Sequence, residues 1–230
     1  TPLSQMVGNQ AVTNVLVGER YKTETVVSSN WPMVKLGEIT EVVSGNGFPK
    51  DLQGDKNGEF PFYKVSDMNL AGNESSMFTS NNYVTHQVLR EQNWKLVPSN
   101  TVIFPKIGAA IATNKKRMLT TESLFDNNVM GLVCGDQVDK RYLYYIIRSI
   151  NLSQWASESN PPSIRKTTVE QFSIPLPPLS VQEEIVSEDV KEEEIVTEEV
   201  VTENVEEIVS EEVKEKKSKK NKSKTEENVV

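Results

Sequence analysis

Three prolines crowded into the segment 174–179 constrain this chain more than any other feature, because they mark where a folded body must end. Pro175, Pro177 and Pro178 each lack a backbone N–H and hold φ at about −65°, so the segment can neither sit in a central strand nor continue a helix. The isoleucine and leucines beside them would hold this extended connector against the body. We therefore predict that the body ends near residue 180 and that the chain is free to become helical from Gln182 onward.

Charge divides the chain at the same place. The formal net charge is −8 over 230 residues, yet residues 1–181 carry 17 Lys and Arg against 16 Asp and Glu, whereas residues 182–230 carry 8 against 17. The body is thus nearly neutral and leaves room for a local basic face. We expect four regions, namely a leader or the end of a preceding region over 1–30, a body over 31–182, a Glu- and Val-rich tail over 183–215, and a Lys-rich disordered tail over 216–230.

The Glu- and Val-rich tail has a pattern that forms no single apolar stripe. It holds 14 Glu and 11 Val or Ile in 33 residues, and β-branched residues recur at every fifth position from Ile185 to Val205. At 3.6 residues per turn, each step of five moves about 140° around a helix. A stable coiled coil needs apolar positions that average about 3.5 residues apart. The tail is therefore predicted to be a transient helix or disordered.

Within the body, short apolar runs rich in β-branched and aromatic residues predict strands. They lie at 41–44, from Phe60 onward, at 101–104 and at 129–134, and several are bounded by glycine or asparagine. Helices are few. The domain is therefore predicted to be mixed α/β (α+β), with a twisted β-sheet of mixed orientation.

Two helical signals stand out in the second half of the body. Asp139 can cap a helix from Lys140 onward, in which apolar residues 143, 146, 147 and 150 recur at helical spacing. Thr167 and Glu170 are spaced as a capping box for one short turn before Phe172. We predict a helix at both places.

Several classes of protein are disfavoured by what the chain lacks. The single Cys134 cannot form a disulfide within the chain or a zinc cluster, and the lone His86 has neither a second histidine nor a cysteine with which to share a metal. No apolar stretch approaches the ~18 residues needed to cross a bilayer. We expect a cytoplasmic protein without a metal, a cofactor or a catalytic residue.

Four stretches, taken in order, resemble a known family. They are the opening at 31–39, the run Phe62-Tyr63-Lys64-Val65-Ser66-Asp67-Met68-Asn69, the run 100–108 that contains Val102-Ile103-Phe104-Pro105-Lys106, and the proline connector with Gln182. Together they are similar to the target recognition domain of the specificity subunits of type I restriction-modification systems. The resemblance covers about residues 31–186. It implies a domain that binds double-stranded DNA, reads half of a split target, and works with a methyltransferase (modification) subunit and a restriction subunit.

This chain departs from the family pattern in two ways. Family members usually carry two such domains, whereas this sequence shows one, so it resembles a half subunit or a fragment whose second half-site would need another copy or another specificity domain. The tail also lacks the leucine-bearing pattern of the family's spacer helix.

Reading a DNA sequence requires polar groups that reach base edges and cations that hold phosphates. In the segment 106–117, Arg117 could pair with guanine and Asn114 with adenine, while the lysines could neutralise phosphates; a hairpin tip with solvated charges explains the same residues. Other candidates lie in three polar loops. The full set of predicted DNA-binding residues is Lys106, Asn114, Lys115, Lys116, Arg117, Asn46, Lys50, Gln53, Lys64, Ser66, Asn69, Ser163, Arg165 and Lys166.

Two other functions remain open from the sequence. Asn160-Pro161-Pro162-Ser163 resembles the motif with which amino-methyltransferases hold adenine, but serine replaces the aromatic residue, and no glycine-rich cofactor turn precedes it. The chain could instead be the C-terminal specificity domain of a single-chain restriction-methylation enzyme. A third hypothesis is an interaction protein that works through its acidic tail.

Overall fold

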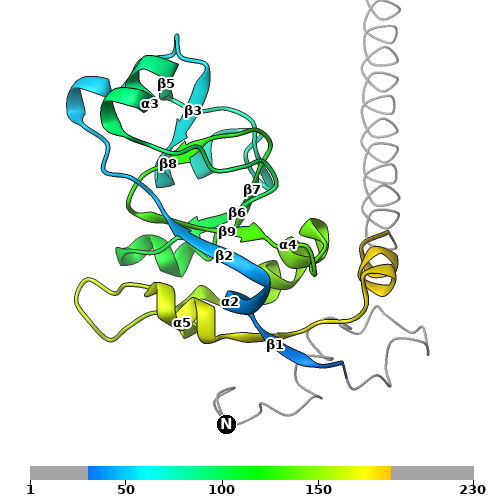
Figure 1. Ribbon diagram of the computed structural model, residues 1–230. Coiled ribbons are helices and arrows are strands. Elements are labelled where there is room, and N and C mark those ends of the chain that lie inside the picture. Colours follow the sequence, from blue (N-terminus) through cyan, green and yellow to red (C-terminus); the bar gives the residue numbers. More distant parts are fainter. Residues whose placement is uncertain (1–30, 188–230) are drawn as a thin grey trace, which may run out of the picture. The chain divides into compact units, whose positions relative to one another are not determined.

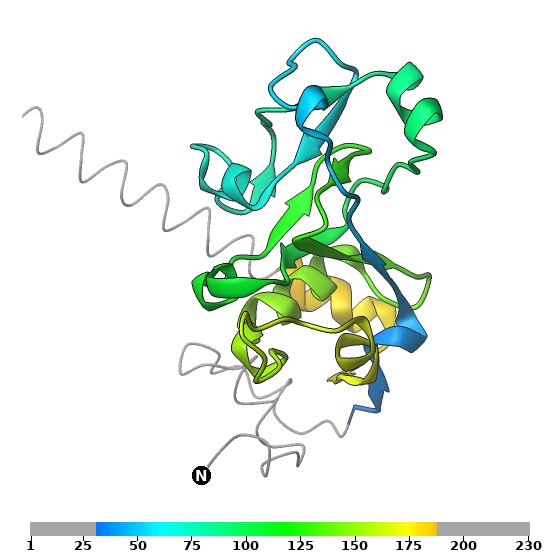
Figure 2. The same ribbon diagram turned by 90° about the vertical axis from the view of Figure 1, so that its left-hand side faces the viewer.

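The computed structural model describes residues 31–187. The predicted leader, the tail beyond residue 187 and the Lys-rich end lie outside the described residues. The chain divides into two compact units, residues 1–183 and 184–230, and the strands and helices from β1 to β10 all belong to the first. Figures 1 and 2 show β3, β5, β8 and α3 at one end of this unit and α4 and α5 toward the other.

A five-stranded sheet forms the centre of the unit. In spatial order its strands are β2 (Thr40–Ser44), β9 (Val129–Cys134), β6 (Val102–Pro105), β7 (Arg117–Leu119) and β4 (Ser76–Met77). All neighbours run antiparallel except β4 and β7, which are parallel. The apolar runs at 41–44, 101–104 and 129–134 are strands, as predicted. The sheet is of mixed orientation, which confirms the predicted mixed α/β class.

A three-stranded sheet lies at one end of the unit. Its order is β5 (Tyr83–Val84), β3 (Phe60–Tyr63) and β8 (Leu124–Phe125), and β3 is parallel to β8. The helix α3 (His86–Gln92) follows β5; Thr85 caps its first turn and Asn93, in the left-handed conformation, ends it. Phe62 stacks on Phe48 with ring centroids 3.8 Å apart, and Trp94 packs beside both. The aromatic content that predicts a strand at Phe60 also builds this small core.

The main helix is α4 (Lys140–Ser149), which begins where the sequence predicts. The Asp139 carboxylate accepts hydrogen bonds from the N–H groups of Arg141 and Tyr142 at 2.8 and 2.9 Å. The four apolar residues at helical spacing are all buried. Burial also raises the pKa of the Tyr142 phenol, which donates to the carbonyl of Pro175 at 2.8 Å.

The short helix α5 (Lys166–Gln171) exists, but the predicted capping box is wrong. Arg165 is the N-cap residue and makes no side-chain capping bond. Thr167 is already inside the first turn, where its hydroxyl cannot reach the N–H groups that a cap satisfies. The remaining short helices are α2 (Leu36–Ile39), η2 (Lys50–Leu52), η3 (Val65–Asn69), η4 (Gly108–Thr113) and η5 (Leu152–Gln154).

The proline connector is extended, as predicted. Its first part is β10 (Ser173–Pro175), which pairs antiparallel with β1 (Met33–Lys35) in a separate two-stranded sheet. Such an edge position suits proline, which cannot donate to a second neighbour. Residues 179–187 are helical.

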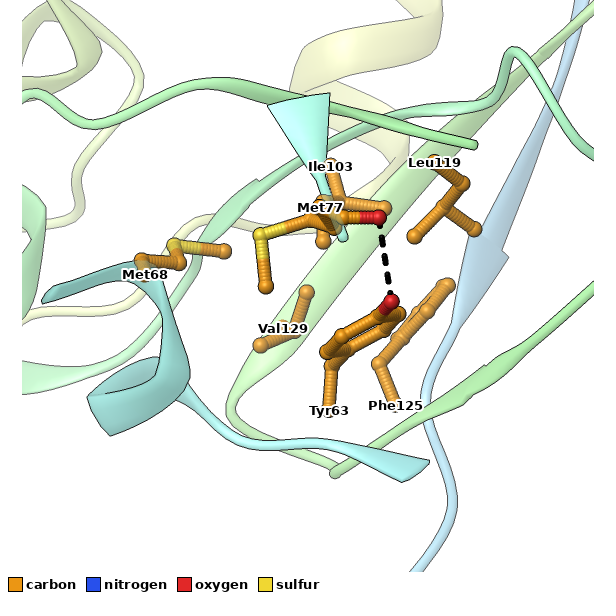
Figure 3. Close-up of a cluster of buried hydrophobic side chains, with 7 residues drawn as sticks. All are labelled: Tyr63, Met68, Met77, Ile103, Leu119, Phe125 and Val129. Atoms are coloured by element: carbon orange, nitrogen blue, oxygen red, sulfur yellow. Dashed lines mark hydrogen bonds between the residues drawn. The ribbon is translucent and has the colours of Figure 1, made fainter. Parts of the chain in front are cut away.

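One cluster of buried side chains joins the two larger sheets (Figure 3). It comprises Tyr63, Met68, Met77, Ile103, Leu119, Phe125 and Val129. The Tyr63 hydroxyl points into the cluster and donates to the carbonyl of Met77 at 3.1 Å. Burial raises the pKa of this phenol. The cluster fixes η3, which carries part of the candidate site, against the central sheet.

Candidate nucleic-acid interface

The residues with predicted DNA contacts fall on loops between the strands. The structure separates them into three groups of exposed or half-buried residues and a set whose side chains bond to other parts of the domain. The first exposed group surrounds η3. Lys64 immediately precedes this helix and donates from Nζ to Oε1 of Gln53 at 3.0 Å, while Ser66 and Asn69 are exposed along it. Lys64 therefore joins two of the predicted loops. Lys115 donates from Nζ to Oδ1 of Asn69, which joins a third.

The loop that follows β2 supplies the second group. Lys50 and Gln53 are exposed at η2, and Gln53 donates from Nε2 to the carbonyl of Phe48 at 3.0 Å. Asn46 bridges to Asp126, and its N–H donates to the carbonyl of Phe125 at 2.9 Å. The loop is thus held against the end of β8.

The third group lies where β6 leaves the sheet. Lys106 donates from Nζ to Oγ of Ser44 at 3.4 Å, and its carbonyl accepts the N–H of Ile164 at 2.8 Å. Ser163 lies beside Ile107 in an isolated bridge. Arg165 and Lys166 are exposed, and Lys166 forms an ion pair with Glu170 at 3.6 Å.

Main-chain contacts place these loops side by side. The N–H of Asp126 donates to the carbonyl of Tyr63, next to Lys64, at 2.9 Å, and the N–H of Lys106 donates to the carbonyl of Asn128 at 2.8 Å. We call the set thus joined the recognition face; it consists of Asn46, Gln53, Lys64, Lys106 and Ser163.

A buried carboxylate lies beneath the recognition face. Burial raises the pKa of Asp126, whereas two hydrogen bonds from Asn128 and the nearby charge of Lys64 lower it. The side chain of Asp126 thus shapes the turn that connects β8 to β9. The ammonium of Lys64 is held by Gln53 in an exposed contact.

The side chains of three predicted DNA-binding residues, Asn114, Lys116 and Arg117, make hydrogen bonds to other parts of the domain, although Asn114 is itself exposed. Lys116 is only 4% exposed, and its ammonium donates to Oδ1 of Asn114 and to the carbonyls of Arg148 and Ile150 at the end of α4. A cation is favoured at the C-terminus of a helix, where carbonyls lack partners. Burial, and secondarily the charge of Arg148, lowers the pKa of Lys116 to about 8.

The side chains of Asn114 and Arg117 also make hydrogen bonds within the domain. The backbone of Asn114 adopts the left-handed conformation, with φ at 56°, and its side-chain Oδ1 also accepts the N–H of Leu152 at 2.9 Å. Arg117 donates to the carbonyls of Lys116 and Met68 at 2.8 and 3.1 Å, its Nε is buried, and burial lowers its pKa. The structure therefore gives the run 114–117 a role in holding the hairpin to α4 and η3. Lys115 is the member of this run whose amine lies on the exposed side.

The sequence reasoning missed a polar hub beside η3. Asp67 and Asn73 are fully buried. The Asp67 carboxylate accepts the N–H of Lys64 and the amide of Asn81, both at 2.8 Å, and Asn73 binds the backbone of the loop 78–79. Asparagine runs in the sequence indicate only turns, so no local signal separates these residues from ordinary loop residues.

Within residues 31–187, no group of three or more His, Cys, Asp or Glu side chains could hold a metal ion. The lone His86 is exposed and lies edge-on to the ring of Phe60, with centroids 4.8 Å apart. No helix in the described part of the chain is long and apolar enough to cross a membrane.

Comparisons with known proteins find relatives of this chain. Two curated relatives are similar in sequence. The type I restriction enzyme MjaIX specificity subunit of Methanocaldococcus jannaschii is 24% identical over 171 residues, which cover 70% of this chain and 37% of the relative. A putative type I restriction enzyme specificity subunit of Haemophilus influenzae is 29% identical over 86 residues, which cover 37% of this chain and 22% of that protein. The chain thus spans well under half the length of these relatives.

Solved structures show the same fold. The crystal structure of the HsdS subunit from Thermoanaerobacter tengcongensis matches with a TM-score of 0.58 and 16% identity, over 84% of this chain and 45% of that one. A chain from a study of complex assembly and conformational transition of the type I R-M system matches with a TM-score of 0.61 and 16% identity, over 82% of this chain and 45% of that one. The family model for the type I restriction modification DNA specificity domain matches residues 28–188, and the chain therefore belongs to that family.

Proposed function

We propose that this chain binds duplex DNA in a sequence-specific manner and supplies target choice to a separate methyltransferase subunit and restriction subunit. Membership of the specificity-domain family supports the class of function. The recognition face carries the proposal at the level of residues, because it gathers amide, hydroxyl and ammonium groups from loops far apart in the sequence. Amides read base edges and lysines hold phosphates, so this set contains both kinds of contact.

The near-neutral body is suited to such binding despite the low pI of the whole chain. Lys64 and Lys106 lie on neighbouring loops, and Lys50, Lys115 and Arg165 are available around them. We propose that these cations contact phosphates, while Asn46, Gln53, Ser66, Asn69 and Ser163 face base edges. Catalysis in this proposal belongs to the partner subunits.

We further propose that the described domain reads one half of a split target. The match to the solved HsdS chain takes in 84% of this chain and only 45% of that one, so a second recognition domain would be needed for the other half. That domain could belong to another copy of this chain or to another specificity domain.

The test is selection from a random duplex library by the full chain in the presence of its methyltransferase subunit. We expect an enriched half-site. We also expect the logarithm of the binding constant to fall linearly with the logarithm of the salt concentration, with a slope of about −0.9 for each phosphate contacted. Equal affinity for every duplex would overturn the proposal. A salt dependence without an enriched half-site would leave DNA binding but remove the specificity role.

A further inference from the structure

Among the described residues, Phe78 exposes its side chain more than any other large apolar residue does, with 65% of its surface accessible. It follows β4 and belongs to neither of the two buried clusters described above, around Tyr63 and around Phe62. A single exposed apolar residue is common and by itself indicates nothing. What distinguishes Phe78 is that buried polar side chains fix the backbone that carries it.

Asn73 is the first of these side chains. It is fully buried, and its Oδ1 accepts the N–H groups of Phe78 and Thr79 at 2.9 and 3.2 Å. Its Nδ2 donates to the carbonyls of Asp67 and Thr79, each at 2.8 Å. An asparagine amide offers two donors and one doubly accepting oxygen. All of this capacity is used to hold the loop at Phe78 to η3.

Asp67 is the second. Its carboxylate, fully buried, binds the N–H of Lys64 before η3 and the amide of Asn81 after Phe78. Hydrogen bonds to Asp67 therefore hold both the residue that precedes η3 and the loop that follows Phe78. Phe78 belongs to the same rigid piece as Lys64, Ser66 and Asn69, which the proposed function places at DNA.

Cations flank this piece at both ends of η3. Lys64 precedes the helix, and Lys115 binds Asn69 at its last residue. Five residues of 3₁₀ helix span about 10 Å, which is close to the ~12 Å width of the major groove. Glu74 is the acidic residue of the loop; it accepts the N–H of Gly72 at 3.2 Å and its charge raises the pKa of Arg117. Its charge is thus partly offset within the protein.

We propose that Phe78 contacts base-pair edges in the major groove, where its ring fits the C5-methyl group of thymine, and that Asp67 and Asn73 are positioning residues for it. Apolar contact with this methyl group is a known form of direct base readout. The arrangement of flanking lysines, polar neighbours on η3 and a rigidly held aromatic ring fits a duplex better than an apolar protein surface. This inference rests on the proposed function and adds a specificity-determining residue to it.

The experiment compares wild type with Phe78→Ala in the duplex selection, using the full chain with the methyltransferase subunit. The variant should lose preference at one or two adjacent base pairs by about 5- to 100-fold, with the other positions and the salt slope unchanged. Since Phe78 is exposed, the melting temperature should not change. Met33→Ala removes another partly exposed apolar side chain, 37% accessible on β1, and should leave the selected site intact.

Replacing the affected thymine by uracil tests the nature of the contact. Wild type should lose about fourfold in affinity, the expected effect of one buried methyl group, whereas Phe78→Ala should be indifferent. Asn73→Ala, measured well below its melting temperature, should blunt preference at the same base pair, and adding Phe78→Ala should bring no further loss. A purely structural asparagine would lower stability without singling out that base pair.

The outcomes separate the two proposals. If wild type selects a half-site and Phe78→Ala selects the same one with equal preference, this inference fails while the proposed function stands. If wild type selects nothing, the proposed function fails. If Phe78→Ala instead loses the methyltransferase subunit in a pull-down and keeps its base preference, Phe78 is a protein contact and the inference is overturned.

Discussion

The side-chain oxygen of Gln182 accepts the N–H of Asp139 at 2.7 Å, although 43 residues separate them. The Gln182 amide also donates to the carbonyls of Gln137 and Pro177 at 3.2 and 2.7 Å. A fully buried side chain thus ties the end of the proline connector to the residue that caps α4.

Gln182→Ala should lower the free energy of unfolding by ~2–4 kcal/mol, because it leaves a cavity and three backbone groups without their partner. Urea denaturation measures the change. Glu183→Ala, at an exposed neighbouring position, is the matched control and should have little effect. Equal stability of the two variants would show that Gln182 is not a structural anchor.

Lys116 predicts a pH dependence of stability with a defined sign. Its folded-state pKa of about 8 lies below its ordinary value of 10.5, so the folded protein binds fewer protons than the unfolded one between those values. The cost of burying the charged amine is present below pH 8 and is relieved as pH rises toward 10.5. Wild type should therefore gain stability relative to Lys116→Met between pH 7 and pH 9.5, as measured by urea denaturation. The other titrating groups are the same in both proteins, so their contributions cancel in the difference between the two free energies of unfolding. A difference that did not change with pH would contradict a lowered pKa for Lys116.

Cys134 should react slowly with thiol reagents in the folded protein. Burial, and secondarily the charge of Asp139, raises its pKa to about 11 from 9.0, which lowers the thiolate fraction at pH 8 on the order of 100-fold. Colorimetric titration with a disulfide reagent, with and without guanidinium, measures the ratio of rates. A rate in the folded protein equal to that in guanidinium would contradict the prediction.

Lys64→Gln and Lys106→Gln should each reduce the slope of log affinity against log salt by about one, if each lysine contacts one phosphate. Both should weaken binding to all duplexes alike. Lys140→Gln, which removes an exposed cation at the start of α4, should leave the slope unchanged. Titrations at several salt concentrations provide the test, and an effect of Lys140 as large as that of Lys64 would remove the recognition face as the phosphate contact.

The sequence predicts the parts of the fold that are encoded locally. Strands β2, β6 and β9 follow from short apolar runs, and helix α4 follows from apolar residues at helical spacing. Asp139 caps the helix as expected because a cap involves neighbouring residues only. The short strands β4, β5 and β8 have two residues each, too few for a periodic signal.

The candidate site was harder to predict, since a list of polar residues does not say which side chains face inward. Lys115 and Lys116 are adjacent, yet one amine lies on the exposed side and the other meets carbonyls of α4, 32 and 34 residues away in sequence. Asp67 joins Asn81 across 14 residues. Pairings of this kind depend on how the loops pack, which no spacing rule in the sequence reports.

The pairing of Met33 with Pro175 has a consequence for how such a body is carried in a polypeptide. In an antiparallel pair the two backbones lie about 5 Å apart, so the chain enters the domain through β1 and leaves it through β10 at neighbouring positions. The distance between these two points is therefore set by the pairing of β1 with β10 and not by the residues that lie between the two strands.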